Sequence, residues 1–146
     1  MLVGYRGFDR AGSEPLFAFG HGLSYTTFKY GAIKLSNQRI SADGDFTTSI
    51  KITNTGKRAG DEVVQLYIHE LKPAVTRPAK ELRGFKRIHL EPGESQTVSI
   101  TVPASKLAFY DESIHAFRVN AGPFEILVGA ASDDIRARAK VEVTAK

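Results

Sequence analysis

The sequence contains no cysteine, no tryptophan and a single methionine. Without cysteine, the chain has no disulfide, no thiolate metal site and no cysteine nucleophile. The same absence does not indicate a compartment, because exported β-sandwiches also exist without disulfides. Cysteine usage therefore excludes three kinds of site and leaves the localisation open.

Long hydrophobic runs are missing as well. No segment approaches the roughly 20 apolar residues of a transmembrane helix, and residues 1–6 lack the apolar centre of a signal peptide. We therefore expect a soluble chain without a signal peptide and without a membrane partner. The sequence does not indicate whether the parent protein is cytoplasmic, periplasmic or secreted.

Charge of one sign is not concentrated in blocks. The 20 lysines and arginines and 16 acidic residues give a net charge of +4, spread along 146 residues. The most basic segments, residues 80–89 and 136–140, fit solvated faces of strands, and no nucleic-acid-binding motif accompanies them. We predict one domain with an appendage, large enough to bury a core, and no nucleic-acid partner.

The clearest pattern is the alternation of apolar and polar residues. In residues 46–54 every second side chain faces one side (Phe46, Thr48, Ile50 and Ile52), a period typical of a half-buried strand. A turn-rich segment leads to residues 61–71, which repeat the pattern. We predict two antiparallel strands around which a β-sandwich is built. The second strand also carries Val63 and Tyr67 on its other face, so we expect something to cover that face.

Further strands are predicted over residues 26–35, 80–90, 95–102 and 135–143. Parity changes at Gly31 and Gly84 indicate bulges. Residues 103–111 suggest one helical turn, residues 91–94 a tight turn, and residues 115–119 are expected to pair with residues 124–128. About eight short strands at this spacing, without long helical periods, predict an all-β sandwich.

Residues 1–25 differ from the rest because glycines alternate with aromatic side chains. Such a composition predicts neither helix nor strand. Burying an aromatic ring contributes about 2–3 kcal/mol, so we expect this segment to lie against a surface of this chain or of another. We therefore divide the chain into an irregular N-terminal arm (1–25) and a sandwich (26–146).

No set of residues predicts catalysis. The acidic pairs at positions 61–62, 111–112 and 133–134 fit turn acids, since strand neighbours point to opposite faces. The four histidines lack metal-ligand spacing, and only His21, inside the arm, suggests a functional role. We predict no catalytic residue, no metal and no cofactor. Exposed aromatic rings are the usual sugar platforms, and Tyr67 and Tyr110 are the weak candidates for sugar contact.

Two segments resemble family 3 glycoside hydrolases, the β-glucosidases and their relatives. Residues 4–9 and 14–28, including the motif from Phe19 to Phe28, look like the junction after the second catalytic domain. Residues 29–146 look like the fibronectin type III-like domain that follows, through the segments 53–67, 77–85, 90–94 and 122–129. The resemblance therefore implies a fibronectin type III/immunoglobulin-like antiparallel β-sandwich.

The resemblance also implies a role without chemistry. The family's retaining mechanism uses an aspartate nucleophile and a glutamate acid/base on two other domains, and no residue here matches either. What carries over is an accessory module that packs on those catalytic domains. Its candidate contact residues lie in the arm and in the proline-flanked loop 72–80: Tyr5, Phe17, Phe19, His21, Tyr25, Pro73, Arg77 and Pro78.

Two alternatives stay open at this stage. In the first alternative the chain is an independent carbohydrate- or polymer-binding module, which requires exposed aromatic side chains as platforms for the sugar. In the second it is a separate subunit that meets its catalytic domains in trans or pairs with itself through the arm. Sugar preference of a parent enzyme is not indicated, because the residues that set it lie mostly outside this chain.

Overall fold

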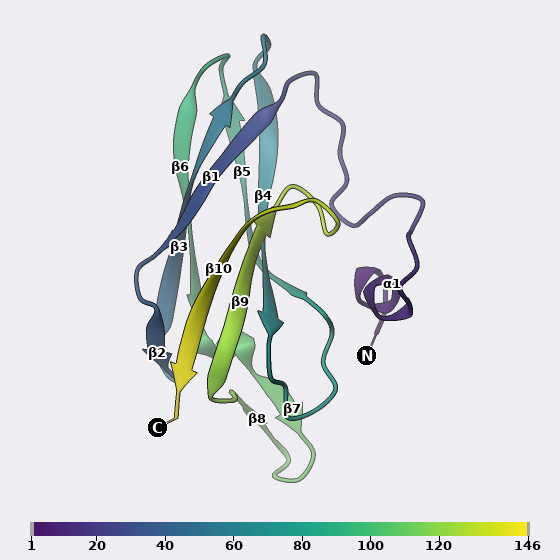
Figure 1. Cartoon of the computed structure of the whole chain (residues 1–146), viewed down its shortest axis with the longest axis vertical. Helices are drawn as coiled ribbons and strands as arrows, with labels where there is room; N and C mark the ends of the chain where they lie inside the picture. The colour runs from purple at the N-terminus through teal and green to yellow at the C-terminus, as the bar shows by residue number, and fades with distance from the viewer. Residues whose placement is uncertain (1, 146) are drawn as a thin grey trace.

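The computed structural model describes residues 2–145 (Figure 1). The elements in chain order are α1 (Tyr5–Ala11), β1 (Phe28–Leu35), β2 (Arg39–Ser41), β3 (Asp45–Asn54), β4 (Gly60–Glu70), β5 (Glu81–Leu90), β6 (Ser95–Pro103), the 3-10 helix η1 (Ala104–Leu107), β7 (Phe109–Asp111), β8 (Ala116–Arg118), β9 (Gly122–Gly129) and β10 (Ile135–Thr144). Neither described helix is long and apolar enough to cross a membrane.

Two sheets face each other across one core. The smaller has the strand order β1-β3-β6 and the larger β2-β10-β9-β4-β5, with β7 and β8 forming a separate hairpin. Pairing is antiparallel except between β10 and β2. Figure 1 shows the arm beside the larger sheet and the hairpin projecting from the lower end. The predicted all-β, fibronectin type III-like sandwich is therefore confirmed.

The core is built from the alternating rows predicted for β3 and β4. Phe46, Ile50 and Ile52 of β3 are buried, as are Val64 and Leu66 of β4. The two strands nevertheless lie in different sheets: β3 pairs with β1 and β6, whereas β4 pairs with β5 and β9. Their apolar rows face one another across the core, which buries both without a shared ladder.

Both predicted bulges are confirmed. The β1–β3 register shifts between Tyr30 and Ile33, and the β4–β5 register shifts opposite Gly84. At Gly84 an added Cβ would lie 2.6 Å from Cγ2 of Ile100. The missing side chain thus lets β5 approach β6, where the larger sheet meets the smaller one.

The connections at both ends of β6 also match the sequence. Gly93 adopts a φ of +78° in the predicted turn, and η1 is the predicted single helical turn. Strand β2 was not predicted, because its three residues are too short to show a period. Only Ile40 of β2 is buried.

Two predictions were wrong. The segment 115–119 does not pair with 124–128: β8 pairs with β7, and β9 pairs with β10 and β4. Adjacent position in the sequence suggested a hairpin, but β9 is needed in the middle of the larger sheet. The arm, predicted without helix, contains α1, which ends at Gly12 in the left-handed conformation (φ +61°).

A buried amide closes the upper end of the sandwich. Asn54 is fully buried, and its Oδ1 accepts hydrogen bonds from Oγ1 of Thr26 (2.6 Å) and the amide of Gly56 (3.0 Å). Its Nδ2 donates to the carbonyls of Arg58 (2.8 Å) and Leu90 (2.9 Å). One side chain thereby joins the starts or ends of three strands and the turn after β3.

Replacing Asn54 with alanine is expected to lower the free energy of unfolding by about 3 kcal/mol, because four partners, of which Thr26 and Leu90 are buried, lose their hydrogen bonds. Urea denaturation measures this as a lower midpoint at unchanged m value. Thr53→Ala, which removes an exposed hydroxyl paired with Ser95, is the control and should change stability by less than about 0.5 kcal/mol. Equal stability of the two variants would contradict the role given to Asn54.

Candidate interdomain surface

Helix α1 covers the outer face of β4, as the apolar side chains on that face led us to expect. The ring of Tyr5 lies edge-on to Tyr67 (centroids 5.8 Å apart, 81°) and against Phe19 (5.2 Å). The hydroxyl of Tyr5 accepts a hydrogen bond from the amide of Leu82 (2.8 Å). This contact also occupies a backbone donor near the start of the edge strand β5.

Tyr67 is consequently inaccessible. Its exposed fraction is 0%, and its hydroxyl donates to Oε1 of Gln65 (2.6 Å). Burial raises the pKa of Tyr67 far above its ordinary value. The ring therefore offers no surface to a sugar in this chain. Tyr110, the other sugar-contact candidate, is about half exposed on the β7–β8 hairpin.

Two ion pairs fix α1 to the loop before β5. The carboxylate of Asp9 lies 2.6 Å from Nζ of Lys80, and Arg6 lies 3.4 Å from Glu81. A helix of seven residues is marginal on its own, so these contacts and the packing of Tyr5 are what hold it in place. The helix that the composition did not predict is stabilised by tertiary contacts.

The second half of the arm contacts the sandwich closely at Gly20. Gly20 has a φ of +82°, and an added Cβ would collide with the amide of Gln65. The preceding Phe19 carbonyl accepts a hydrogen bond from the amide of Ser132 (2.9 Å), and Ala18 is buried. The backbone of the arm therefore follows the sandwich closely at this point.

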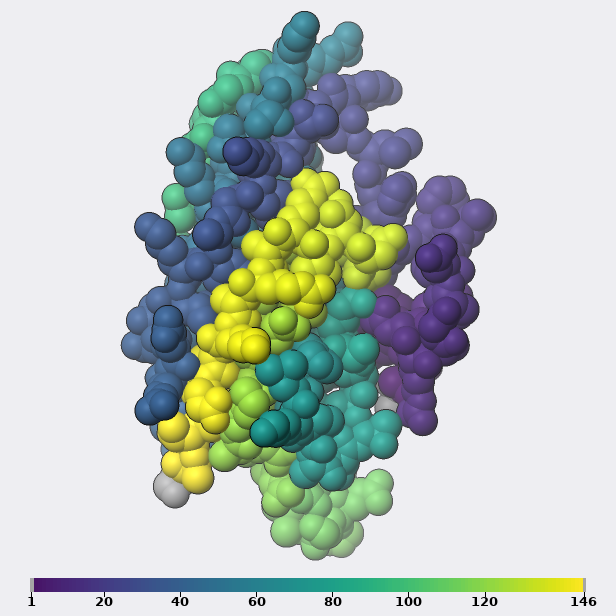
Figure 2. All heavy atoms as spheres, in the orientation of Figure 1, coloured from purple at the N-terminus to yellow at the C-terminus, as the bar shows by residue number. Residues whose placement is uncertain are grey.

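The other side of the arm faces solvent. Four large apolar side chains, together called the arm patch, are exposed: Leu16 (91%), Phe17 (69%), Leu23 (95%) and Tyr25 (90%). The ring of Phe17 lies 5.6 Å from the ring of His21, which is also exposed. Figure 2 shows the arm standing beside the sandwich with a hollow between them. This cleft of about 850 Å³ is lined by residues 20–24, 26–28, 61–63, 130, 131, 133, 134 and 136, so Leu23 of the arm patch borders it.

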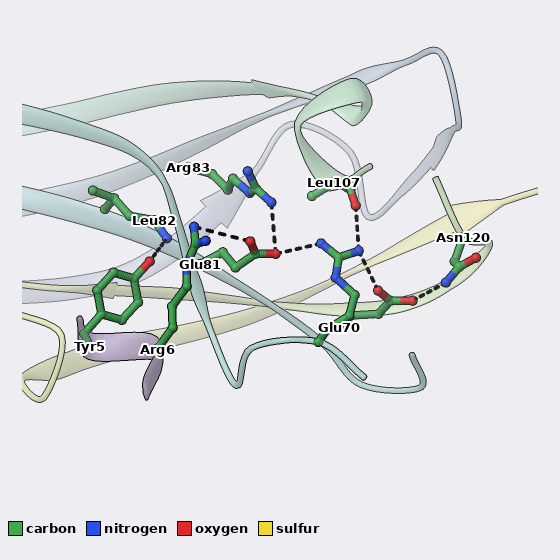
Figure 3. Close-up of polar contacts among 9 residues, drawn as sticks. Tyr5, Arg6, Glu70, Glu81, Leu82, Arg83, Leu107 and Asn120 are labelled. Carbon is green, nitrogen blue, oxygen red and sulfur yellow. Dashed lines mark hydrogen bonds and ion pairs between the residues drawn. The ribbon is translucent and has the colours of Figure 1, made fainter. Parts of the chain in front are cut away.

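Loop 72–80 is held by an arginine that we predicted to be a contact residue. The side chain of Arg77 is only 9% exposed. Its guanidinium donates to Glu70 (2.9 Å), to Glu81 (2.7 Å) and to the carbonyl of Leu107 (3.0 Å) (Figure 3). It also lies over the ring of Phe109, 5.6 Å from the ring centroid. The guanidinium of Arg77 is thus engaged in hydrogen bonds inside the chain and is not available to a partner domain.

The same cluster reaches two further segments. The second oxygen of Glu70 accepts from Nδ2 of Asn120 (2.8 Å), and Glu81 is also approached by Arg83 (2.9 Å) and Arg6 (Figure 3). Loop 72–80, the base of the β7–β8 hairpin and helix α1 are therefore joined through two carboxylates. Pro73 lies exposed on this loop and Pro78 is half-buried.

Glu70 and Glu81 were missed as structural residues, although the sequence carried a signal for one of them. Glu70 continues the inward row of Val64, Leu66 and Ile68. A carboxylate at a core position requires a buried cation or hydrogen-bond donor. The position of Glu70 in the alternating row therefore predicted such a partner. No comparable signal marked Glu81.

The pKa of Glu81 reflects two opposing causes. Burial alone would raise the pKa, but the hydrogen bond from Arg77 and the charges of Arg83, Arg77 and Arg6 outweigh it, so the pKa lies below its usual value. The carboxylate is therefore ionised in the folded protein at neutral pH. Its negative charge is what compensates the buried arginine.

The predicted turn acids occupy turns or strand ends and are mostly paired locally. Asp61 holds Arg87 and His89, Asp111 holds Arg118, and Asp134 holds Arg136. Hydrogen bonds from these partners lower the pKa of Asp61 and of Asp134. Within residues 2–145 no three His, Asp or Glu side chains are grouped so as to hold a metal ion.

Residues 62–132 match the family described as the fibronectin type III-like domain. The chain contains a fibronectin type III-like domain. It is 45% identical to thermostable beta-glucosidase B of Acetivibrio thermocellus, over 98% of this chain and 19% of that protein. The crystal structure of a beta-glucosidase from Kluyveromyces marxianus in complex with glucose matches with a TM-score of 0.89 and 39% identity, over 98% and 17% of the two chains.

A third match names the glycoside hydrolase family. The GH3 beta-glucosidase of Bifidobacterium adolescentis superposes with a TM-score of 0.90 at 33% identity, over 97% of this chain and 21% of that one. The chain thus spans about a fifth of the length of the relatives that it matches. The fibronectin type III-like domain and the arm together correspond to one small segment of such enzymes.

Replacing Arg77 with methionine is expected to destabilise the fibronectin type III-like domain by about 3–5 kcal/mol, because Glu70 stays buried without its cation and Glu81 loses one of the arginines that compensate it. Thermal or urea denaturation measures the loss. The matched control is Arg87→Met, since Arg87 is 71% exposed and its ion pair within residues 2–145 is with Asp61; it should cost less than about 1 kcal/mol. Similar losses in both variants would show that burial of the pair is unimportant.

The depressed pKa of Glu81 predicts a dependence of stability on pH. A group whose folded pKa is below its unfolded value stabilises above the unfolded pKa, about 4.3 for glutamate, and this contribution disappears as the pH falls through the folded pKa. Denaturation between pH 3 and 6 should therefore show a smaller slope for Glu81→Gln than for the unchanged chain. Glu112→Gln, at an exposed turn position, should keep the original slope.

Proposed function

We propose that this chain is a non-catalytic packing module of a family 3 β-glucosidase. The parent enzyme hydrolyses terminal β-D-glucosyl residues by a retaining mechanism, with both carboxylates on other domains. The similarity to several β-glucosidases over nearly the whole chain supports this proposal. Catalysis is not assigned to any residue of this chain.

The observation that carries the proposal is the two-sided arm. On one side Tyr5 packs against Tyr67 and Ala18 is buried, whereas the side chains of the arm patch are exposed. Large apolar side chains gathered on one exposed segment are typical of interfaces with another protein surface. Because Gly20 and the ion pairs of α1 hold the arm on the sandwich, its outer side is presented in a defined position.

The partner is therefore a pair of catalytic domains that cover Phe17, Tyr25 and their apolar neighbours. Pro73 and Val75, exposed at the tip of loop 72–80, are a second contact candidate. Burial of large aromatic side chains often dominates the affinity of such interfaces. The module thereby stabilises its partner domains and leaves the chemistry to them.

A second copy of the chain is the alternative occupant of the arm patch. The isolated chain would then form a dimer whose mass in solution depends on concentration, and exposed aromatic side chains favour such pairing. Light scattering of the chain alone, and of the chain with Phe17 and Tyr25 changed to serine, separates self-association from packing on catalytic domains.

The proposal is tested in a chimera that carries this chain in place of the matching segment of thermostable beta-glucosidase B. The chimera should hydrolyse an aryl β-glucoside, and the chain alone should not. Changing Phe17 and Tyr25 to serine should lower the thermal midpoint of the chimera by about 2 °C or more, because two buried aromatic contacts are lost. The isolated chain should keep its stability, since both side chains are exposed there.

The control variant changes Ser99 and Thr101 to alanine on the outer face of the smaller sheet, where both hydroxyls are exposed. It should leave the chimera unchanged. Turnover by the isolated chain above the blank would contradict a non-catalytic role. An unchanged thermal midpoint for the variant with Phe17 and Tyr25 changed to serine would show that these side chains do not contribute to the interface.

A further inference from the structure

The β7–β8 hairpin projects beyond the sandwich and exposes large apolar side chains (Figures 1 and 2). Phe117 is 74% exposed, Ile114 54% and Tyr110 49%. These three side chains are called the hairpin tip below. The rings of Tyr110 and Phe117 meet edge-on, with centroids 5.4 Å apart. Large apolar side chains on one exposed element are typical of a contact with another protein surface.

Polar contacts hold the base and the turn of the hairpin. Arg118 forms an ion pair with Asp111 across the two strands (2.9 Å) and lies over the ring of Phe109, 5.4 Å from the centroid. Oδ1 of Asp111 also accepts hydrogen bonds from the amide (2.9 Å) and the hydroxyl (2.6 Å) of Ser113. The hairpin tip is therefore presented on an ordered support, which lowers the entropy lost when a partner binds it.

The hairpin lies at the opposite end of β4 from the arm patch. Leu23 of the arm patch borders the cleft lined by the first residues of β4, and the ring of Tyr25 lies 6.0 Å from the guanidinium of Arg58, which precedes that strand. Asn120, just after β8, instead bonds to Glu70, the last residue of β4. The two apolar surfaces are therefore separated by about the length of β4, roughly 30 Å for 11 residues.

Loop 72–80 connects these two regions. Arg77 of the loop donates to the carbonyl of Leu107, just before β7, and Arg6 of α1 reaches Glu81 at the end of the loop. Val75 is exposed on the same loop. Figure 1 shows the loop between α1 and the hairpin. A partner that covers the arm and the tip of this loop therefore lies next to the hairpin.

The hairpin tip is too small for a stable contact by itself. Three side chains exposed by about half to three quarters offer on the order of 350 Å². That area is less than half of the roughly 800 Å² that each partner buries in a stable interface. A dimer held by two hairpin tips would therefore be weak, whereas the tip fits one part of a larger interface that includes the arm patch.

We propose that the hairpin tip is a second docking point of this chain on the catalytic domains. The inference rests on the packing role proposed above and adds a contact to it. An arm contact alone leaves the sandwich free to rotate about the arm, whereas a second contact at the far end of β4 fixes its orientation. Because both contacts join the same bodies, the second forms at high effective concentration and needs little affinity of its own.

The chemistry of the hairpin defines the surface that receives it. The three apolar side chains of the tip require an apolar recess. Asp111 and Arg118 neutralise each other, whereas Glu112, exposed on the turn, makes no ion pair within residues 2–145. With His115 neutral, the hairpin carries one net negative charge, which favours a basic side chain beside that recess.

The test compares amide hydrogen exchange in the 146-residue chain alone and in the chimera with thermostable beta-glucosidase B. Residues 110–118 should exchange about tenfold more slowly in the chimera, because the partner covers them. Residues 91–96, an exposed segment around the turn between β5 and β6, are the internal control and should exchange equally in both proteins. Equal exchange of residues 110–118 in the two proteins would overturn the proposal.

A variant with Ile114→Ser and Phe117→Ser provides a second measurement. It should lower the thermal midpoint of the chimera by about 2 °C or more and restore fast exchange of residues 110–118. The isolated chain should lose less, because both side chains are exposed there. The control with Ser99 and Thr101 changed to alanine should change neither quantity.

The arm variant separates this inference from the packing role. A lower chimera midpoint on changing Phe17 and Tyr25 to serine, with no effect of the hairpin variant, would keep the packing role and refute the hairpin contact. No effect of either variant would count against both. Slower exchange of residues 110–118 in the isolated chain as its concentration rises from about 0.01 mM to about 1 mM would assign the hairpin tip to a second copy instead.

Discussion

The pairing of Arg77 with Glu70 and Glu81 is the interaction on which the lower end of the molecule depends. Removing three charges from water is costly unless each is closely compensated, so none of the three can be lost alone. Arg77 lies on loop 72–80, Glu70 ends β4, and Glu81 begins β5. The loop cannot move without exposing these charges to solvent or leaving them buried without a partner of opposite charge. Through Arg6 and Lys80 the same requirement extends to helix α1.

Burial of apolar surface passes outward from the core in successive layers. The inner faces of the two sheets bury each other, and the outer face of β4 leaves Tyr67 to be covered. The arm covers it with Tyr5, against which Phe19 packs in turn. The arm in turn presents Phe17 and the other side chains of the arm patch, which residues 2–145 leave exposed. A further protein layer would bury the exposed apolar side chains of the arm, and the proposed catalytic domains would supply this layer.

The strands and the core were predictable because period-two alternation is local, and so were the bulges at Gly31 and Gly84, where the parity changes. Which strands pair was not predictable from adjacent segments, because the partners of β9 lie before and after it in the chain. Helix α1 escaped prediction because its stability comes from tertiary contacts. Arg77 was expected at a contact surface because it lies in a loop that contains two prolines. The charge of Glu70 in the core row was the signal that could have indicated a buried cation.

The two ends of the sandwich are closed by polar side chains that continue a core row, and the difference between them bears on function. Asn54 ends the row of β3 with a neutral amide that is fully satisfied by four hydrogen bonds. Glu70 ends the row of β4 with a charge that requires Arg77. A neutral closure depends little on pH and salt, whereas the charged one includes Glu81, whose lowered pKa makes its contribution to stability depend on pH. The end that carries the β7–β8 hairpin, where α1 contacts Glu81, is thus the end whose order is coupled to ionisation.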